Sequence, residues 1–89
     1  MFDSKTIYLD YAATTPIAKE VFSAMEPFLT TEFGNPSSKH LFGNKSRVAV
    51  EESRKTIAEF LGVQPSEVIF TSSGCESNTL ALKGVMNRV

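Results

Sequence analysis

The chain has 89 residues, of which 42% are hydrophobic and 21% are charged, a composition typical of one small water-soluble domain. Nine basic and ten acidic residues leave a formal net charge of -1, and no cluster of Lys and Arg marks a nucleic-acid-binding surface. The N-terminal stretch "MFDSKTIYLD" contains acidic residues and no apolar run, so we expect no signal peptide, no membrane span and a cytoplasmic protein.

The first predicted elements are an extended segment and a helix. Residues 7–10, "IYLD", are rich in β-formers and predict a short strand. After the loop "YAATTP", Thr15 is expected to cap a helix that has Pro16 at its first position. Apolar residues at helical spacing give this helix one apolar face: Ile17, Val21, Met25 and Phe28. Pro27 removes a backbone hydrogen bond, so we predict a kink or a break near Glu26.

The middle of the chain combines a long loop with the clearest helix. Residues 33–44, "FGNPSSKHLFGN", are dense in Gly, Pro, Asn and Ser and predict a loop of a length that is commonly functional or disordered. Residues 45–62 predict a helix in which Glu51 pairs with Lys55 and which Gly62 ends. One side of that helix carries Val50, Ser53, Ile57, Phe60 and Leu61.

The last part of the chain predicts a turn, a strand and a helix. In "VQPSEVIFTS" a proline turn precedes residues 68–70, an apolar run suited to a strand that is buried on both faces. Helical spacing returns from residue 75, weakened at Gly84 by about 1 kcal/mol relative to alanine. The order indicates an α/β protein, mostly helical, with one or two short strands and a thin core. Because the second strand lacks a good neighbour, we expect the chain to associate, as a dimer or a larger oligomer.

The turn before the last helix has two interpretations. Backbone N–H groups at a helix start are unpaired, and the helix dipole favours an anion there. Gly74 would allow close approach, and Ser72, Ser73 and Ser77 carry hydroxyl donors. The alternative is that these residues only cap the helix. The sequence contains neither a P-loop nor a dinucleotide-binding fingerprint.

Two single residues are weak candidates for chemistry. His40 fits a hydrogen-bonding group in a loop or an interface better than a catalyst. Cys75 fits a small buried residue better than a reactive thiol. As the one cysteine in the sequence, it excludes an intrachain disulfide and a multi-cysteine metal site, and it suits a reducing compartment. No metal site is expected, and these residues do not name a reaction.

Three stretches taken in order closely resemble the N-terminal part of the cysteine desulfurases, pyridoxal-phosphate enzymes of aminotransferase class V with fold type I. They are "YLDYAATTP", "FGNPSSKHLFG" and "EVIFTSSGCESNTLALKG", and the resemblance covers residues 7–84. It implies that residues 1–65 are part of a small domain and that residues 66–89 begin a cofactor-binding domain. The family takes sulfur from L-cysteine, leaves L-alanine, and passes the sulfur as an enzyme persulfide to iron–sulfur cluster assembly or thiolation.

The resemblance also assigns site residues. Ser73, Gly74 and Cys75 match the turn that binds the phosphate of pyridoxal phosphate, although the family usually has threonine where this chain has Cys75. By the same resemblance, two loops lie near the substrate, the active site or a dimer interface, and they carry Ala12, Thr14, Asn35, Ser37 and His40. No position matches a Schiff-base lysine or a persulfide cysteine, so no catalytic residue is assigned and the chain alone is expected to be inactive. A non-catalytic module for dimerisation or partner binding, or a segment of another class V aminotransferase, is the alternative.

Overall fold

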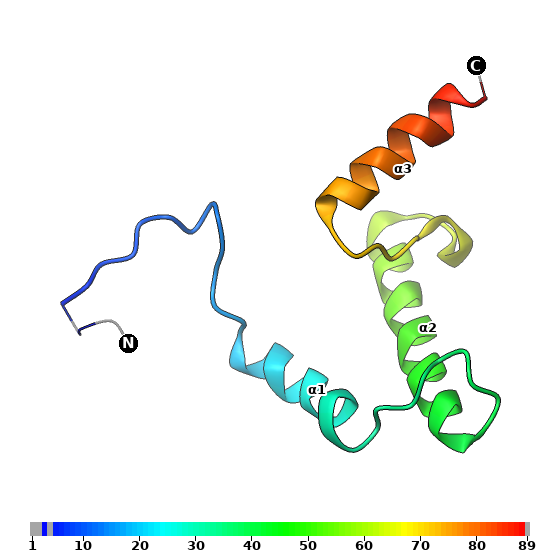
Figure 1. The fold of residues 1–89 in the computed structure, drawn as a ribbon, viewed down its shortest axis with the longest axis horizontal. Coiled ribbons are helices and arrows are strands. Elements are labelled where there is room, and N and C mark those ends of the chain that lie inside the picture. Colours follow the sequence, from blue (N-terminus) through cyan, green and yellow to red (C-terminus); the bar gives the residue numbers. More distant parts are fainter. Residues whose placement is uncertain (1–2, 4, 89) are drawn as a thin grey trace. The chain divides into compact units, whose positions relative to one another are not determined.

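A computed structural model describes residue 3 and residues 5–88 as a succession of helices and loops (Figure 1). The elements are α1 (Lys19–Thr30), α2 (Leu41–Leu61), the short 3-10 helix η1 (Pro65–Glu67) and α3 (Gly74–Met86). The chain divides into two compact units, residues 1–47 and residues 48–89. No helix of the described residues is both long enough and apolar enough to cross a membrane.

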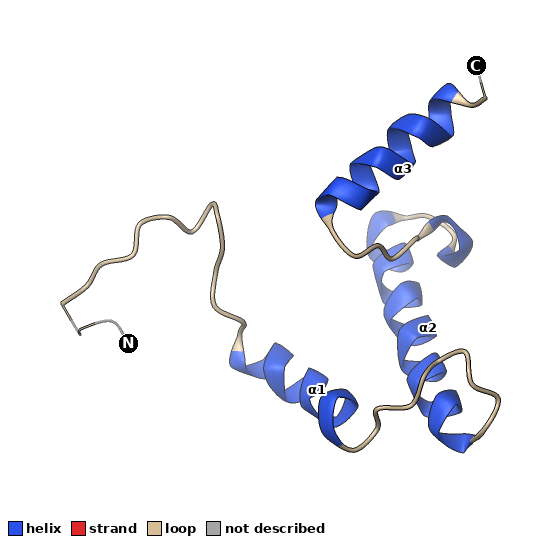
Figure 2. Cartoon of the chain, viewed as in Figure 1, coloured by secondary structure: helices blue, strands red, loops and turns tan. Residues whose placement is uncertain are grey.

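Extended segments are present, but the part of the chain that the structure describes contains no β-strand (Figure 2). The strands predicted at residues 7–10 and 68–70 are therefore not confirmed. Val68 has φ -95° and ψ 120°, which is the backbone conformation of a strand. A strand also needs a neighbour that supplies a ladder of hydrogen bonds. The sequence thus identified extended backbone, for which the described residues provide no partner.

Helix α1 begins later than predicted and runs through its proline. Its N-cap is Ala18, which makes no side-chain cap, so the predicted start at Thr15 and Pro16 is wrong. Its first backbone bond joins Phe22 N–H to the carbonyl of Ala18 at 2.9 Å. The alternative of a kink stays a prediction, but the predicted break near Glu26 is wrong, because α1 continues through Pro27, which removes only its own donor. Its carbonyl still accepts from the N–H groups of the two residues after the helix, at 3.0 and 2.7 Å.

Helix α2 begins at Leu41 instead of Lys45, which shortens the predicted loop of residues 33–44. His40 provides the reason, because its Nδ1 accepts from the Gly43 N–H at 3.4 Å and caps the new first turn. At the other end Gly62 has φ +69° and closes the helix, as predicted. The Val63 N–H bonds to the Ala58 carbonyl at 3.0 Å, which is the bond between C″ and C3 of a Schellman ending.

The ion pairs along α2 differ from the expected one. Glu51 pairs with Arg54 at 3.3 Å, and Lys55 pairs with Glu59 at 3.9 Å, so the predicted pair of Glu51 with Lys55 is wrong. The Arg54 guanidinium also donates to the Val68 carbonyl and lies 4.9 Å from the centre of the Phe70 ring. Arg54 therefore fixes the extended segment before α3 to the side of α2. Exposed pairs such as Lys55 with Glu59 contribute little stability.

The core is even thinner than predicted. Ala58 is the only buried apolar side chain among the described residues, whereas Leu9 is 88% exposed and Phe60 is 89% exposed. The expected apolar face of α1 is also exposed, at Val21, Met25 and Phe28. Apolar side chains exposed in such number mark contact surfaces.

Candidate functional site

The turn before α3 is fixed by hydroxyl groups. Ser73 is the N-cap, with φ -166° and ψ 164°, and its Oγ accepts from the Glu76 N–H at 3.2 Å. The Thr71 hydroxyl lies 2.6 Å from that of Ser77 and 3.1 Å from the Ser73 carbonyl. The predicted helix is present and begins at Gly74, one residue before the predicted start at Cys75. Local hydrogen bonds therefore hold the turn on both sides of the cap.

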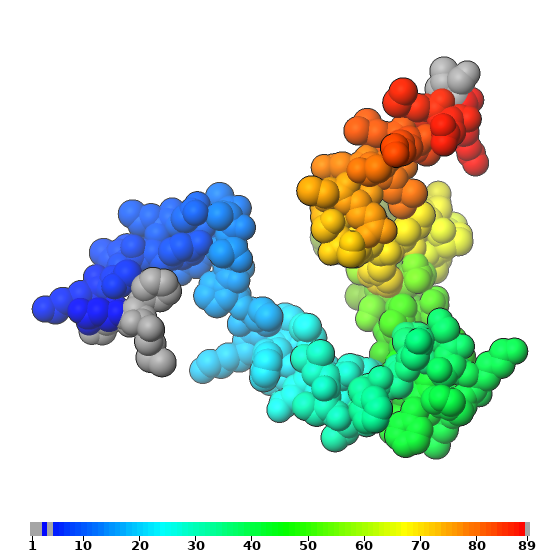
Figure 3. Space-filling view, in the orientation of Figure 1, coloured from blue at the N-terminus to red at the C-terminus, as the bar shows by residue number. Residues whose placement is uncertain are grey.

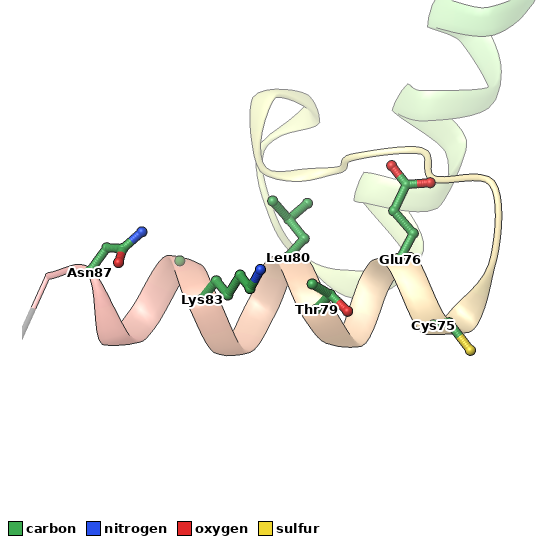
Figure 4. A pocket seen from close by; sticks show the side chains of 7 residues that line it. Cys75, Glu76, Thr79, Leu80, Lys83 and Asn87 are labelled. Carbon is green, nitrogen blue, oxygen red and sulfur yellow. The ribbon is translucent and has the colours of Figure 1, made fainter.

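Glu76 reinforces the turn with its carboxylate. One carboxylate oxygen accepts from the Ser72 hydroxyl at 2.5 Å and from the Ser72 backbone N–H at 2.8 Å. These two bonds, the hydroxyl first, lower the pKa of Glu76 below its ordinary value. In Figure 4 the Glu76 side chain rises from α3 toward the preceding loop. The donors of Ser72 are thus occupied within the chain.

Two donors remain at the start of α3. The backbone N–H groups of Gly74 and Cys75 belong to the first turn, whose N–H groups have no partner inside the helix. Among the described residues neither N–H has an acceptor from another part of the chain. The helix dipole adds a partial positive charge at the same place. Apart from its chain neighbours and the backbone of α3, no atom lies within 4 Å of the position that a Cβ on Gly74 would take, so the space beside the turn is open.

Cys75 is exposed, so the prediction of a buried cysteine is wrong. Cys75 stays exposed because the preceding extended segment lies against another flank of α3, which carries Ser77, Ala81 and Val85. In Figure 3 the yellow atoms of this segment lie beside the orange atoms of the helix. Residues from both elements line a groove on that flank, including Ile69, Thr71 and Val85. The Cys75 thiol points away from the preceding loop, and the residue lines a second groove with Thr79, Leu80 and Lys83 (Figure 4).

The loop that carries Ala12 and Thr14 is closed by a tyrosine. The Asp10 carbonyl accepts from the Ala13 N–H at 3.0 Å and from the Tyr8 hydroxyl at 2.9 Å, and the Thr14 carbonyl lies 3.4 Å from the same hydroxyl. The Tyr8 and Tyr11 rings meet edge to face, with centres 5.1 Å apart. Sequence reasoning missed Tyr8 as a positioning group, although an aromatic residue two positions before a turn aspartate was a visible signal.

The loop that carries the other three predicted site residues is ordered by their own side chains. Asn35 Oδ1 accepts from the Ser37 N–H at 2.9 Å, and the Asn35 carbonyl accepts from the Ser38 N–H at 2.9 Å. His40 acts through Nδ1 as the cap of α2, which confirms it as a hydrogen-bonding loop residue. No hydrogen bond or ring contact among the described residues joins this loop to Ala12 or Thr14.

The predicted site residues are divided between the two units. Ala12, Thr14 and the loop of residues 35–40 belong to the first unit, and the turn of residues 73–75 belongs to the second. The described residues contain no group of three or more His, Cys, Asp or Glu side chains that could hold a metal ion. At the start of α3, the N–H groups of the first helical turn and the helix dipole are features that suit an anion.

Comparison with known proteins defines the class. The family model for aminotransferase class V matches residues 7–89, so the chain belongs to the class V aminotransferase family. Within that class the chain is similar to the protein "Cysteine desulfurase IscS" of Dictyoglomus turgidum, with 58% identity over 81 residues, 91% of this chain and 21% of the relative. The protein of the same name from Rickettsia massiliae is 52% identical over 80 residues, 89% of this chain and 20% of the relative.

These findings confirm the resemblance to the N-terminal part of the cysteine desulfurases. The chain spans about a fifth of the length of the curated relatives that it matches. No solved structure matches the chain. The family identity therefore rests on sequence, and the site geometry rests on the structure described above.

Proposed function

We propose that this chain is the N-terminal part of a pyridoxal-phosphate-dependent cysteine desulfurase and that its α3 turn anchors the cofactor phosphate. The observation that carries the proposal is the pair of N–H groups at Gly74 and Cys75, beside the Ser73 cap, for which the described residues provide no acceptor. Family membership supports it, because class V aminotransferases depend on pyridoxal phosphate. In this proposal residues 1–65 are part of a small domain and residues 66–89 begin the cofactor-binding domain.

The residues present fit a phosphate group. The start of α3 suits an anion, because it offers two backbone N–H groups and the dipole of a helix of 13 residues. The Ser73 hydroxyl accepts a hydrogen bond from the Glu76 N–H and still has its own proton to donate. The family usually has threonine at the position of Cys75, and a thiol is the weaker donor, so the backbone contacts carry the binding. When bound, pyridoxal phosphate supplies an electron sink, and the role of these residues is to position it.

The remaining site residues are assigned by the same proposal. Ala12 and Thr14 lie near the substrate, which is L-cysteine, and the loop with Asn35, Ser37 and His40 lies near the active site or a dimer interface. The products are L-alanine and a persulfide sulfur for iron–sulfur assembly or thiolation. The exposed apolar side chains favour a homodimer or a larger oligomer, and the free thiol suits the cytoplasm.

The extended segments acquire a role in the same proposal. Residues 7–10 and 68–70 become short strands of an α/β fold of type I once a neighbouring strand is available. The conformation of Val68 supports this assignment, since it already has the dihedral angles of a strand. The chain by itself remains inactive, because the reaction needs a lysine and a nucleophilic thiolate that none of its positions matches.

A segment exchange tests the proposal. The 81 residues of this chain that match the Dictyoglomus turgidum relative replace the corresponding segment of that relative, and alanine release from L-cysteine is measured. We expect the exchanged protein to keep at least about a tenth of the relative's rate, which corresponds to a loss of about 1.4 kcal/mol in transition-state stabilisation. The 89-residue chain should release alanine no faster than free cofactor.

The outcome that contradicts the proposal is an exchanged protein that folds and shows cofactor absorbance but releases no alanine. If, in addition, the 89-residue chain associates by itself in sedimentation, the result supports the alternative of a non-catalytic module. The unaltered relative serves as the positive control for the assay.

A further inference from the structure

Residues 32–46, a loop followed by the first turns of α2, form a segment whose two ends are joined, which we call the closed loop. The Glu32 carbonyl accepts from the Ser46 hydroxyl at 3.1 Å, and the Glu32 carboxylate pairs with Lys45 at 2.9 Å. Ser46 is only 7% exposed and is the buried polar residue of the described chain. A compact loop with adjoining ends is frequently functional. All of these contacts lie within the first unit.

Two glycines interlock the two sides of the closed loop. A Cβ on Gly34 would lie under 3.0 Å from the backbone carbonyl of Phe42. A Cβ on Gly43 would lie under 3.0 Å from the backbone carbonyl oxygens of Asn35 and Ser38. These neighbours are backbone atoms, which cannot rotate away as the end of a flexible side chain could. Both positions therefore require glycine, because only glycine allows this close approach.

The interlock fixes side chains that the proposed function uses. Asn35 Oδ1 and His40 Nδ1 bond to backbone N–H groups inside the closed loop, at 2.9 and 3.4 Å. The Asn35 amide nitrogen, the Ser37 hydroxyl and the second ring nitrogen of His40 have no partner among the described residues. All three residues are exposed. The closed loop thus orders their backbone while it leaves hydrogen-bonding atoms for a ligand or a facing subunit.

We propose that Gly34 and Gly43 are positioning residues, which interlock the closed loop and so hold Asn35, Ser37 and His40 in a preformed arrangement. The inference rests on the proposed function for the role of these three side chains. It goes beyond that function in assigning their arrangement to two residues that contact no ligand. Preformed geometry reduces the entropy that binding must otherwise overcome.

Hydrogen exchange on the 89-residue chain tests the interlock without any activity. Gly43→Ala and Gly34→Ala are compared with Gly84→Ala, a matched control because nothing lies within 4 Å of its added Cβ. We expect the backbone amides at positions 38 and 43 to exchange about tenfold faster in the loop variants and at the normal rate in the control. Unchanged exchange in Gly43→Ala would overturn the interlock.

A milder pair of variants covers the case in which a glycine variant fails to fold. Ser46→Ala removes only the hydroxyl that joins the loop ends, and Ser53→Ala removes an exposed hydroxyl that bonds to the Ala49 carbonyl of the same helix at 2.8 Å. Faster exchange of the loop amides is expected in the first and not in the second. Equal rates in both would count against the closed loop.

Kinetic measurements on the segment-exchanged relative distinguish a positioning role of the glycines from a role in folding alone. We expect Gly43→Ala to raise the KM for L-cysteine about tenfold with a smaller change in kcat and normal cofactor absorbance, and Gly84→Ala to change neither by more than about twofold. If hydrogen exchange in the closed loop becomes faster in the glycine variants but KM and kcat do not change, the glycines are merely structural and the inference is overturned. If the segment-exchanged protein is inactive without these substitutions, the proposed function is refuted. The hydrogen-exchange rates of the 89-residue chain would still show whether the two glycines interlock the closed loop.

Discussion

The cap of α3 determines the geometry of the proposed phosphate turn, and Ser73→Ala removes it. The Ser73 Oγ accepts from the Glu76 N–H at 3.2 Å, and alanine would leave that N–H to water. Replacing a serine cap by alanine costs about 1 kcal/mol, which is a factor of about five in the population of the helix start. No residue of α3 is buried among those described, so packing within the chain does not offset the loss.

The assay is the set of carbon chemical shifts that report helicity at residues 74–80 in the 89-residue chain. Ser53→Ala is the matched control, because its hydroxyl lies on the exposed surface in the middle of α2 and alanine is favoured there by about 0.5 kcal/mol. We expect Ser73→Ala to lower helicity at the start of α3 and Ser53→Ala to preserve or raise it in α2. Equal shifts in the two variants would refute the reasoning about the cap.

Three further predictions follow from local contacts. Because Ser72 lowers the pKa of Glu76 from its ordinary 4.5, the stability contributed by that carboxylate is present above pH 4.5 and is lost as the pH falls through the lowered pKa. A titration that follows carbon chemical shifts at the start of α3 should show this loss, and Glu76→Gln should abolish it. Identical titration curves for the two proteins would contradict the prediction. Gly62→Ala should destabilise the end of α2 by about 1–2 kcal/mol in urea unfolding, since φ is +69° and no neighbour clashes; an unchanged midpoint would argue against backbone strain. Arg54→Met should move the ring signals of Phe70, which lies 4.9 Å from the guanidinium, and unchanged signals would show that the contact does not form in solution.

Local signals in the sequence predicted the elements whose ends depend on neighbouring residues. Gly62 ends α2 because a positive φ suits glycine, and Ser73 caps α3 through a bond to a residue three positions later. The turn at Pro65 follows from the fixed φ of proline in the same way. Each of these features involves a span of only a few residues, so the sequence alone was sufficient.

Features that depend on contacts between residues farther apart in the sequence were not predicted. The start of α2 at Leu41 depends on the His40 cap and on the packing of Gly43 against the loop, which no periodic pattern reveals. The exposure of Cys75 depends on which flank of α3 receives the preceding segment. The segment at residues 68–70 has extended backbone but needs a neighbouring strand, and Arg54 occupies the carbonyl of Val68 instead.

The most direct test of the central claim, a phosphate anchor at the start of α3, is a titration of the 89-residue chain with inorganic phosphate. The amide signals of Gly74 and Cys75 are followed, with chloride at matched ionic strength as the control. Because the turn supplies only the phosphate contacts, we expect saturable shifts at about millimolar concentration, and weaker binding in Ser73→Ala. Shifts at these two amides that are no larger than those in chloride would contradict the account.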